Sequence, residues 1–123
     1  MHYDVTIGIP AFRVENYIRR TMESVLSQTY LNIEFLIIDD GSDDKTLEII
    51  ESIKDSHPRG GDIRVLAHSS NLGVSETRNH IIDEAHGDYL YFVDSDDMIA
   101  PQTITLLMNQ IQDKGLEDRK SVV

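Results

Sequence analysis

Residues 89–97 read YLYFVDSDD, and this stretch decides the fold. Its first five residues are hydrophobic without strict alternation, which is typical of a strand buried on both faces of a parallel sheet. The strand ends in the carboxylates of Asp94, Asp96 and Asp97, which repel one another unless a cation lies between them. In extended backbone, Asp94 and Asp96 would point to one side and share a divalent ion such as Mg²⁺ or Mn²⁺. The alternative explanation is an acidic turn that caps a helix beginning near Pro101.

Three other hydrophobic runs are predicted to be strands: Val5–Ile9, Ile33–Ile38 and Ile63–Leu66. Between and after the strands, hydrophobic residues recur at helical spacing. The four predicted helices carry Ile18, Met22, Val25 and Leu26; Leu47, Ile50 and Ile53; Val74, Thr77, Ile81, Ile82 and Ala85; and Ile104, Leu107, Met108 and Ile111. This alternation predicts an α/β fold, a mostly parallel sheet with helices on both faces.

Several single residues predict where these elements begin and end. Pro10 is expected to stop the first strand, because it cannot donate a backbone hydrogen bond. Ser42 or Asp43 is suited to cap the N-terminus of the second helix, and Gly87 is suited to end the third.

The composition excludes two classes of partner. The 123 residues include 11 basic and 22 acidic side chains, and the net charge of −11 argues against a nucleic-acid surface and a basic membrane patch.

No cysteine is present, so disulfides and thiol chemistry are excluded. No hydrophobic run approaches the roughly 20 residues of a membrane span, and the N-terminus lacks the features of a signal peptide. We therefore expect a soluble, cytoplasmic protein.

Three predicted strands end in residues suited to ligand binding. Phe12 lies just beyond Pro10, the second strand ends in Asp39 and Asp40, and the fourth ends in the acidic residues 94–97. Ligands of open α/β sheets bind beyond the carboxyl ends of the strands. A cation at residues 94–97 would hold a diphosphate, a carboxylate of the second strand would accept a hydrogen bond from a base, and Phe12 would lie against that base. A turn with a helix cap at residues 39–40, and a core position for Phe12, are the alternatives.

Two kinds of basic residue need interpretation. Arg78 lies in the predicted third helix, where it would either neutralise a diphosphate or extend along the surface. The five histidines share no spacing that is typical of a metal site, so we predict that they are surface residues.

Six segments occur in an order that resembles one protein family. They are Val5–Pro10, Ser24–Tyr30, Ile37–Ser42, Asn71–Ser75, Thr77–Asn79 and Phe92–Asp97. Together they resemble the donor-binding half of family-2 glycosyltransferases of the Rossmann-like GT-A fold, from about Asp4 to Pro101. The resemblance implies a nucleotide-diphosphate sugar donor, a Mn²⁺ or Mg²⁺ cofactor and inversion at the anomeric carbon.

The resemblance also implies roles for individual residues. Nucleotide binding falls to Pro10, Phe12, Asp39, Asp40, Arg78, Asp94 and Ser95. Asp96 is the main metal ligand, with Asp94 beside it. Asp40 pairs with the base, which in the family is usually uracil, so a UDP-sugar is the expected donor. Arg13 occupies a position where the family commonly has asparagine, which leaves the donor contacts of this first loop open.

The resemblance divides the chain unequally. Residues 1–117 are expected to form part of a GT-A domain, and residues 118–123 a tail that we interpret as a non-native read-through. The general base is expected downstream of this chain, so no catalytic residue is assigned. A glycan or lipid-linked hydroxyl is the expected acceptor. The acceptor-binding half, which is expected downstream of this chain, would bring the enzyme to the cytoplasmic face of the membrane. An unprotected sheet edge would favour self-association.

Two other functions fit parts of the pattern. The chain could be a non-catalytic nucleotide-binding fragment. It could also be a Mg²⁺-binding response-regulator receiver domain, which is acidic, α/β and of similar length. The acidic pair of a receiver follows its first strand, however, whereas a complete strand and helix precede Asp39 here.

Overall fold

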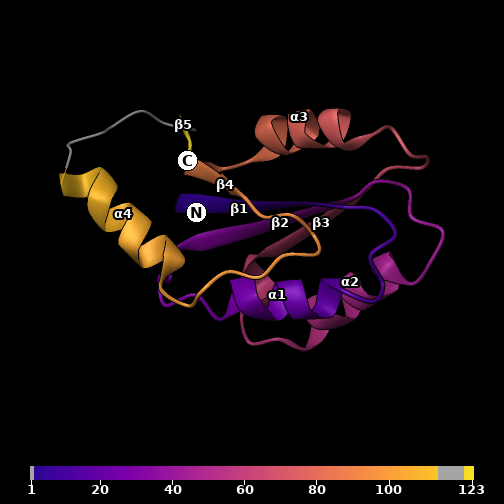
Figure 1. Cartoon of the computed structure of the whole chain (residues 1–123), viewed down its shortest axis with the longest axis horizontal. Coiled ribbons are helices and arrows are strands. Elements are labelled where there is room, and N and C mark those ends of the chain that lie inside the picture. The colour runs from indigo at the N-terminus through magenta and orange to yellow at the C-terminus, as the bar shows by residue number, and fades with distance from the viewer. Residues whose placement is uncertain (1, 114–120) are drawn as a thin grey trace.

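The computed structural model describes residues 2–113 and 121–123. Strands and helices alternate along the chain (Figure 1). Their bounds are β1 Tyr3–Ala11, α1 Ile18–Leu26, β2 Ile33–Asp39, α2 Thr46–Ser56, the 3₁₀ turn η1 Gly60–Asp62, β3 Ile63–Ala67, α3 Val74–Glu84, β4 Gly87–Phe92, α4 Thr103–Asp113 and β5 Ser121–Val122. The predicted strands and helices are thus confirmed, although several begin or end elsewhere.

The strands of the described residues form one parallel sheet in the order β3-β2-β1-β4-β5. The predicted parallel α/β fold is therefore confirmed. In this order the chain first adds strands on one side of β1 and then crosses to the other, so the switch point lies between β1 and β4. A receiver domain has the order 2-1-3-4-5, so the receiver alternative is wrong.

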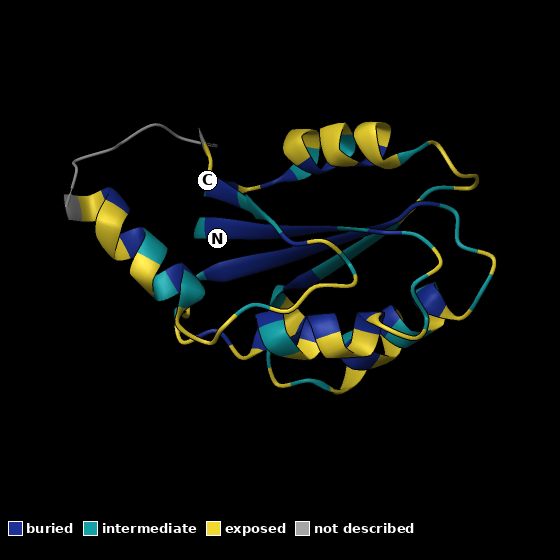
Figure 2. Ribbon diagram, in the orientation of Figure 1, coloured by how far each residue is buried: buried dark blue, intermediate teal, exposed yellow. Residues whose placement is uncertain are grey.

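Helices cover both faces of the sheet (Figure 1). The larger part of the core lies between the sheet and the helices α1, α2 and α4, around Phe35. A smaller cluster lies under α3 on the opposite face, where Ile81 packs against Leu36 and Leu90. Figure 2 shows the buried strands between helices whose outer faces are exposed. Val74 and Ile82, two of the hydrophobic residues of this helix, are exposed, because α3 covers only this small cluster.

Pro10 does not stop the first strand, which continues to Ala11. Pairing between β1 and β4 ends at Gly8 and Phe92, whereas pairing with β2 includes Pro10 opposite Ile38. A proline is tolerated here because the strand has a neighbour on one side only at this point.

Two predicted helix ends were also wrong. Helix α2 begins at Thr46, and the hydroxyl of Ser42 instead accepts a hydrogen bond from the Arg13 N–H at 2.9 Å. Helix α3 ends at Glu84, and Gly87 is the first residue of β4. A Cβ atom on Gly87 would lie 2.4 Å from the Thr6 nitrogen. This glycine therefore permits close approach of two strands.

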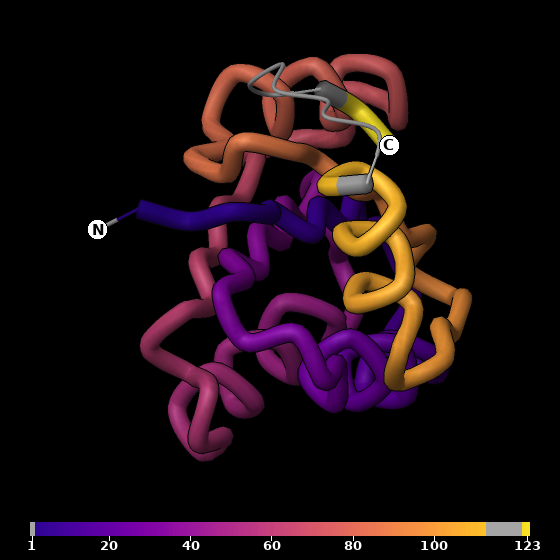
Figure 3. The backbone as a smooth tube through the Cα atoms, turned by 90° about the vertical axis from the view of Figure 1, so that its left-hand side faces the viewer, coloured from indigo at the N-terminus to yellow at the C-terminus, as the bar shows by residue number. Residues whose placement is uncertain are grey.

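The C-terminal end of the described chain joins the sheet. Ser121 and Val122 pair with Tyr89 and Leu90 of β4, and the Val123 N–H donates to the Leu90 carbonyl at 2.9 Å (β5, yellow in Figure 3). The predicted boundary between residues 117 and 118 lies outside the described residues, so the interpretation of the tail stays a prediction.

None of the helices in the described residues has both the length and the hydrophobicity that crossing a membrane requires.

Candidate functional site

A cavity of about 290 Å³ lies at the carboxyl ends of β1 and β4. Six of the predicted site residues line it: Pro10, Phe12, Asp40, Asp94, Ser95 and Asp96. Asn71, Val74 and Thr77, from the loop after β3 and from α3, complete one wall. The cavity thus occupies the switch point of the sheet, where open α/β folds bind their ligands.

The acidic residues after β4 reach the cavity from a turn. The backbone is not extended at Ser95 and Asp96, and the Asp97 N–H donates to the Asp94 carbonyl at 3.0 Å. The prediction that an extended strand aligns Asp94 and Asp96 is therefore wrong, yet both residues line the same cavity. Among the described residues none forms a hydrogen bond with the Asp96 carboxylate, which is exposed. Two carboxylates at one cavity fit a hard divalent cation such as Mg²⁺ or Mn²⁺.

Arg78 lies beside this turn and does not line the cavity itself. Its Nη2 donates to the Asp94 carboxylate at 3.2 Å, and its guanidinium carbon lies 5.7 Å from the centroid of the Phe92 ring. The two side chains are 46% and 57% exposed. Exposed ion pairs contribute little to stability, so a ligand can replace this one at small cost. A cation on Asp94 would leave the guanidinium free to contact a phosphate.

Asp40 is held by three donors. Its Oδ1 accepts from the Leu72 N–H at 2.9 Å and lies 2.7 Å from His68 Nδ1, and its Oδ2 accepts from the Gly73 N–H at 2.9 Å. Burial disfavours the ionised form, but the hydrogen bonds from His68, Leu72 and Gly73 outweigh it and lower the pKa of Asp40. The carboxylate is therefore ionised at neutral pH, and each oxygen offers about two acceptor positions. Described residues fill three of these positions, so one position on Oδ2 remains.

His68 was predicted to be a surface residue, and this is wrong. Its side chain is only 10% exposed, and its Nε2 lies 2.8 Å from Nδ1 of His80 on α3. Sequence reasoning missed the residue because nothing local connects it with Asp40, which lies 28 positions earlier.

Asp39 is 2% exposed and does not line the cavity. Its side chain lies on the same face of β2 as Phe35 and Ile37, the face that packs against α1 and α2. Its Oδ2 accepts from the Ser42 N–H at 3.2 Å, while its Oδ1 forms no hydrogen bond within the part of the chain that the structure describes. The structure thus separates the two neighbouring aspartates, and only Asp40 lines the cavity.

Phe12 and Arg13 form the first loop of the site. The Arg13 guanidinium carbon lies 4.9 Å from the centroid of the Phe12 ring. The Nε and Nη2 atoms of the same group donate to the two carboxylate oxygens of Asp43. Arg13 has a φ of 51°, a left-handed conformation that asparagine adopts more readily than arginine. Asparagine, which the resemblance leads us to expect at this position, would adopt this backbone more easily, and the Arg13–Asp43 ion pair is too exposed to add much stability.

Thr21 of α1 and Gln28, which follows this helix, position the loop that carries the acidic residues. Gln28, which is 3% exposed, donates from Nε2 to the Ala100 carbonyl at 2.7 Å and accepts from the Ile104 N–H at 3.1 Å. The Thr21 hydroxyl donates to the Ser95 carbonyl at 2.9 Å. Neither role was predicted, although a buried glutamine after a hydrophobic helix face is a signal that could have pointed to it.

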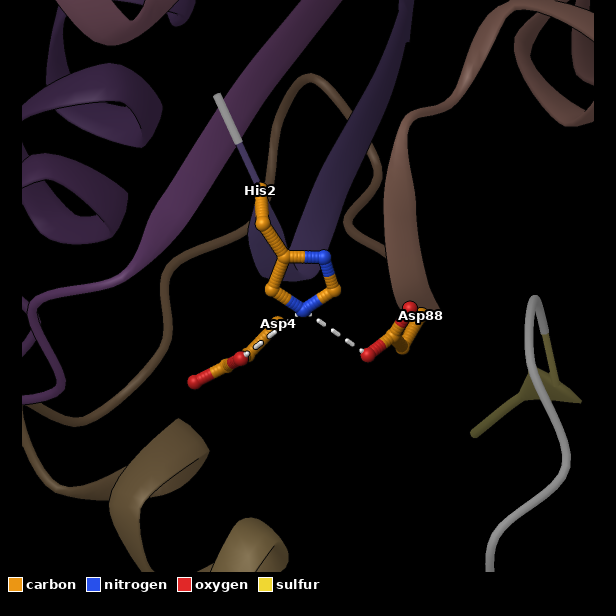
Figure 4. A group of neighbouring side chains, drawn as sticks. All are labelled: His2, Asp4 and Asp88. Carbon is orange, nitrogen blue, oxygen red and sulfur yellow. Dashed lines mark ion pairs between the residues drawn. The ribbon is translucent and has the colours of Figure 1, made fainter.

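A second group of titratable side chains lies at the opposite edge of the sheet (Figure 4). His2 Nε2 lies 3.4 Å from Asp4 Oδ1 and 3.0 Å from Asp88 Oδ2. The group stands at the start of β1 and β4, whereas the cavity lies where these parallel strands end. The two sites are therefore separate.

Several known proteins are similar to this chain in sequence and fold. The chain matches the model for glycosyl transferase family 2 over residues 6–118. An uncharacterized glycosyltransferase of Haemophilus influenzae is 38% identical over 85% of this chain and 41% of that protein. The chondroitin synthase of Pasteurella multocida is 36% identical over 91% of this chain and 11% of the synthase. Residues 1–349 of Staphylococcus aureus TarS, solved in complex with UDP-GlcNAc, give a TM-score of 0.82 at 27% identity over 89% of this chain and 31% of that one.

The chain spans less than half the length of each of these relatives. Within that span the agreement is broad, because the family model covers all but the ends of the chain and the sheet has the arrangement of glycosyltransferase structures. The predicted GT-A fold is confirmed. This chain belongs to glycosyl transferase family 2.

Proposed function

We propose that this chain is the donor-binding part of a metal-dependent, inverting glycosyltransferase. The enzyme would transfer a sugar from a nucleotide-diphosphate sugar, with UDP as the favoured nucleotide, to an acceptor hydroxyl in glycan or polysaccharide synthesis. One observation carries the proposal. A single cavity at the switch point is lined by the ionised carboxylate of Asp40, which can accept a hydrogen bond from the nucleotide base, and by the carboxylates of Asp94 and Asp96, which can bind a cation.

The base is the first part of the donor that these residues would recognise. The one acceptor position left on Asp40 suits the single N–H of uracil, which lies between two carbonyl groups. Phe12 lines the same cavity and offers an aromatic ring beside the base. A UDP-sugar donor also agrees with the UDP-GlcNAc complex of TarS.

The diphosphate would lie at the turn after β4. Asp96 and Asp94 would hold Mn²⁺ or Mg²⁺, which when bound would neutralise the negative charge that develops on the leaving nucleoside diphosphate. Arg78, released from Asp94, would contact a phosphate oxygen, and Ser95 offers a hydroxyl on the same turn. Asp39 would support nucleotide binding without lining the cavity, because its hydrogen bond from the Ser42 N–H fixes the loop that follows Asp40.

The reaction would be a single displacement. The acceptor oxygen forms a bond to the anomeric carbon while the bond from that carbon to the β-phosphate oxygen breaks, which inverts the configuration. A general base takes the hydroxyl proton, and the nucleoside diphosphate leaves with the bonding electron pair. We place that base outside the described residues, because none of the carboxylates that line the cavity is free of a donor-binding role. The residues of this chain would bind and orient the donor.

A second candidate is nucleotide binding without sugar transfer by these 123 residues. It is favoured by the coverage of 41% or less of the relatives' length. Donor turnover against a panel of glycan acceptors separates the two candidates. We expect binding without transfer from this polypeptide, and efficient transfer would show that we have misplaced the base.

Calorimetric titration tests the proposed donor directly. UDP, GDP, CDP and ADP are titrated into the full chain with Mn²⁺, and UDP also with the metal removed. We expect UDP to bind most tightly and to bind more weakly without Mn²⁺. Absence of binding, or the same affinity for all four nucleotides, would contradict the proposed function.

A further inference from the structure

We propose that His68 is a positioning residue that makes the site selective for a base with a single donor. It does so by filling one acceptor position of Asp40, so that the carboxylate can accept only one hydrogen bond from a base. The proposal rests on the proposed function of Asp40 in base recognition, and it adds a residue whose effect is on the choice between uracil and guanine.

The two oxygens of Asp40 are occupied unequally. Within the described part of the chain, Oδ1 has two partners, His68 Nδ1 at 2.7 Å and the Leu72 N–H at 2.9 Å, whereas Oδ2 has one, the Gly73 N–H at 2.9 Å. A carboxylate oxygen accepts about two hydrogen bonds. Oδ1 is therefore saturated, and the open position lies on Oδ2 alone.

His68 is fixed in place on three sides. Its backbone N–H donates to the Asp39 carbonyl at 2.8 Å, its Nδ1 contacts Asp40, and its Nε2 lies 2.8 Å from His80 Nδ1. The two imidazole rings are nearly parallel, with centroids 5.1 Å apart. Because the ionised carboxylate accepts only, His68 donates from Nδ1, and the Nε2 of the neutral ring then accepts from the N–H of His80 Nδ1. The ring cannot turn away from Asp40 without breaking both side-chain bonds.

The saturation of Oδ1 matters because bases differ in their donors. Uracil presents one ring N–H between two acceptors. Guanine presents a ring N–H and an adjacent amino group, and a carboxylate satisfies both only if each of its oxygens has an open position. With His68 in place, one guanine donor would be left unpaired in a desolvated site, which is unfavourable. Without the imidazole, Oδ1 would open and the carboxylate could accept both donors.

The test is the ratio of UDP affinity to GDP affinity, measured by calorimetry on the full chain with Mn²⁺. For His68→Ala we expect this ratio to fall about tenfold, close to the effect of one hydrogen bond. His68→Asn should restore it, because the amide nitrogen of asparagine can take the place of Nδ1. His80→Ala should lower the ratio less, since His68 then loses one support. His2→Ala, at the opposite sheet edge, is the control and should leave the ratio unchanged.

The outcomes separate this inference from the proposed function. A wild-type chain that binds neither nucleotide, or that prefers GDP, contradicts the proposed function and this inference with it. A wild-type chain that prefers UDP, with the same ratio in His68→Ala, contradicts the role of His68 alone. If His68→Ala does not fold, His80→Ala and His68→Asn decide: a reduced ratio in the first and a wild-type ratio in the second support the proposal, and an unchanged ratio in His80→Ala overturns it.

Discussion

Asp96 has an exposed carboxylate on the cavity, and among the described residues it has no hydrogen-bond donor. Its oxygens are therefore available to a cation. We expect Asp96→Ala to abolish the part of UDP binding that depends on Mn²⁺, a loss of more than about tenfold, since even changes behind a metal ligand cost that much. Asp94→Ala should have a smaller effect, because this carboxylate already pairs with Arg78.

The matched control for Asp96 is its neighbour Asp97. Both side chains are exposed and carry the same charge, but Asp97 does not line the cavity. Asp97→Ala should therefore bind UDP and Mn²⁺ as the wild type does. Equal losses in Asp96→Ala and Asp97→Ala would mean that the general negative charge of this turn attracts the metal, and that no specific ligand is present.

Asp40 should make stability depend on acid pH. Its pKa is lowered in the folded state, because three hydrogen bonds to the carboxylate outweigh its burial. A lowered pKa adds stability that is fully present above the pKa of the unfolded state and is lost as the pH falls through the folded value. We expect the free energy of unfolding, measured with urea between about pH 5 and pH 2, to fall more steeply in the wild type than in Asp40→Asn. Parallel curves would contradict this.

At the scale of the elements, Thr21 of α1 and Gln28 just after this helix hold the loop between β4 and α4. Gln28→Leu keeps the volume of the side chain but leaves the Ala100 carbonyl and the Ile104 N–H without their partner. We expect the free energy of unfolding to fall by about 2 kcal/mol. UDP affinity should fall as well, because residues 94–96 lie on this loop. Gln110→Leu, on an exposed position of α4, is the control, and an equal loss in both variants would exclude the positioning role.

The contact between β1 and β4 depends on a glycine. A Cβ atom on Gly87 would lie 2.4 Å from the Thr6 nitrogen, whereas one on Gly61 would meet no atom within 4 Å. Gly87→Ala should therefore lower the free energy of unfolding by about 1–3 kcal/mol, the usual cost of overpacking, and Gly61→Ala should not. Thermal unfolding of the two variants measures the difference, and similar melting temperatures would show that the strands can separate without cost.

At the scale of the whole molecule, local patterns predicted the elements and distant contacts decided the rest. The hydrophobic runs around Phe35 and Leu90 indicate strands without knowledge of the neighbouring strands, because a strand buried on both faces is hydrophobic at nearly every position. Gly87 was misplaced because its role depends on Thr6, which lies 81 residues earlier. The sequence alone does not indicate such pairing, so the order of the strands was not predicted.

In the candidate site, too, local patterns predicted some residues, whereas features that depend on distant contacts were missed. Asp40, Asp94 and Asp96 were predicted because each follows a hydrophobic strand, and the ends of parallel strands meet at one edge. The different surroundings of Asp39, the last residue of β2, and of Asp40, which follows it, were missed, because neighbouring residues of an extended chain point to opposite faces of the sheet. The bond between His68 and Asp40 joins residues of neighbouring strand ends and needs the fold to be seen.

The molecule presents two groups of carboxylates to a cation, at opposite edges of one sheet. Asp94 and Asp96 lie at the cavity, and Asp4 and Asp88 lie with His2 where β1 and β4 begin (Figure 4). Strand β1 has nine residues, so its ends are separated by roughly 26 Å at about 3.3 Å per residue. A paramagnetic ion bound at one edge can therefore be distinguished from an ion at the other.

The most direct measurement is an NMR titration of the full chain with Mn²⁺ in the presence of UDP. The ion broadens the signals of nearby backbone amides. We predict that broadening centres on residues 94–97 and that shifts caused by UDP include Phe12, Asp40 and Asn71, which line the same cavity. Broadening centred on His2, Asp4 and Asp88, with the cavity residues unchanged, would contradict the central claim that the carboxyl ends of β1 and β4 form the donor site.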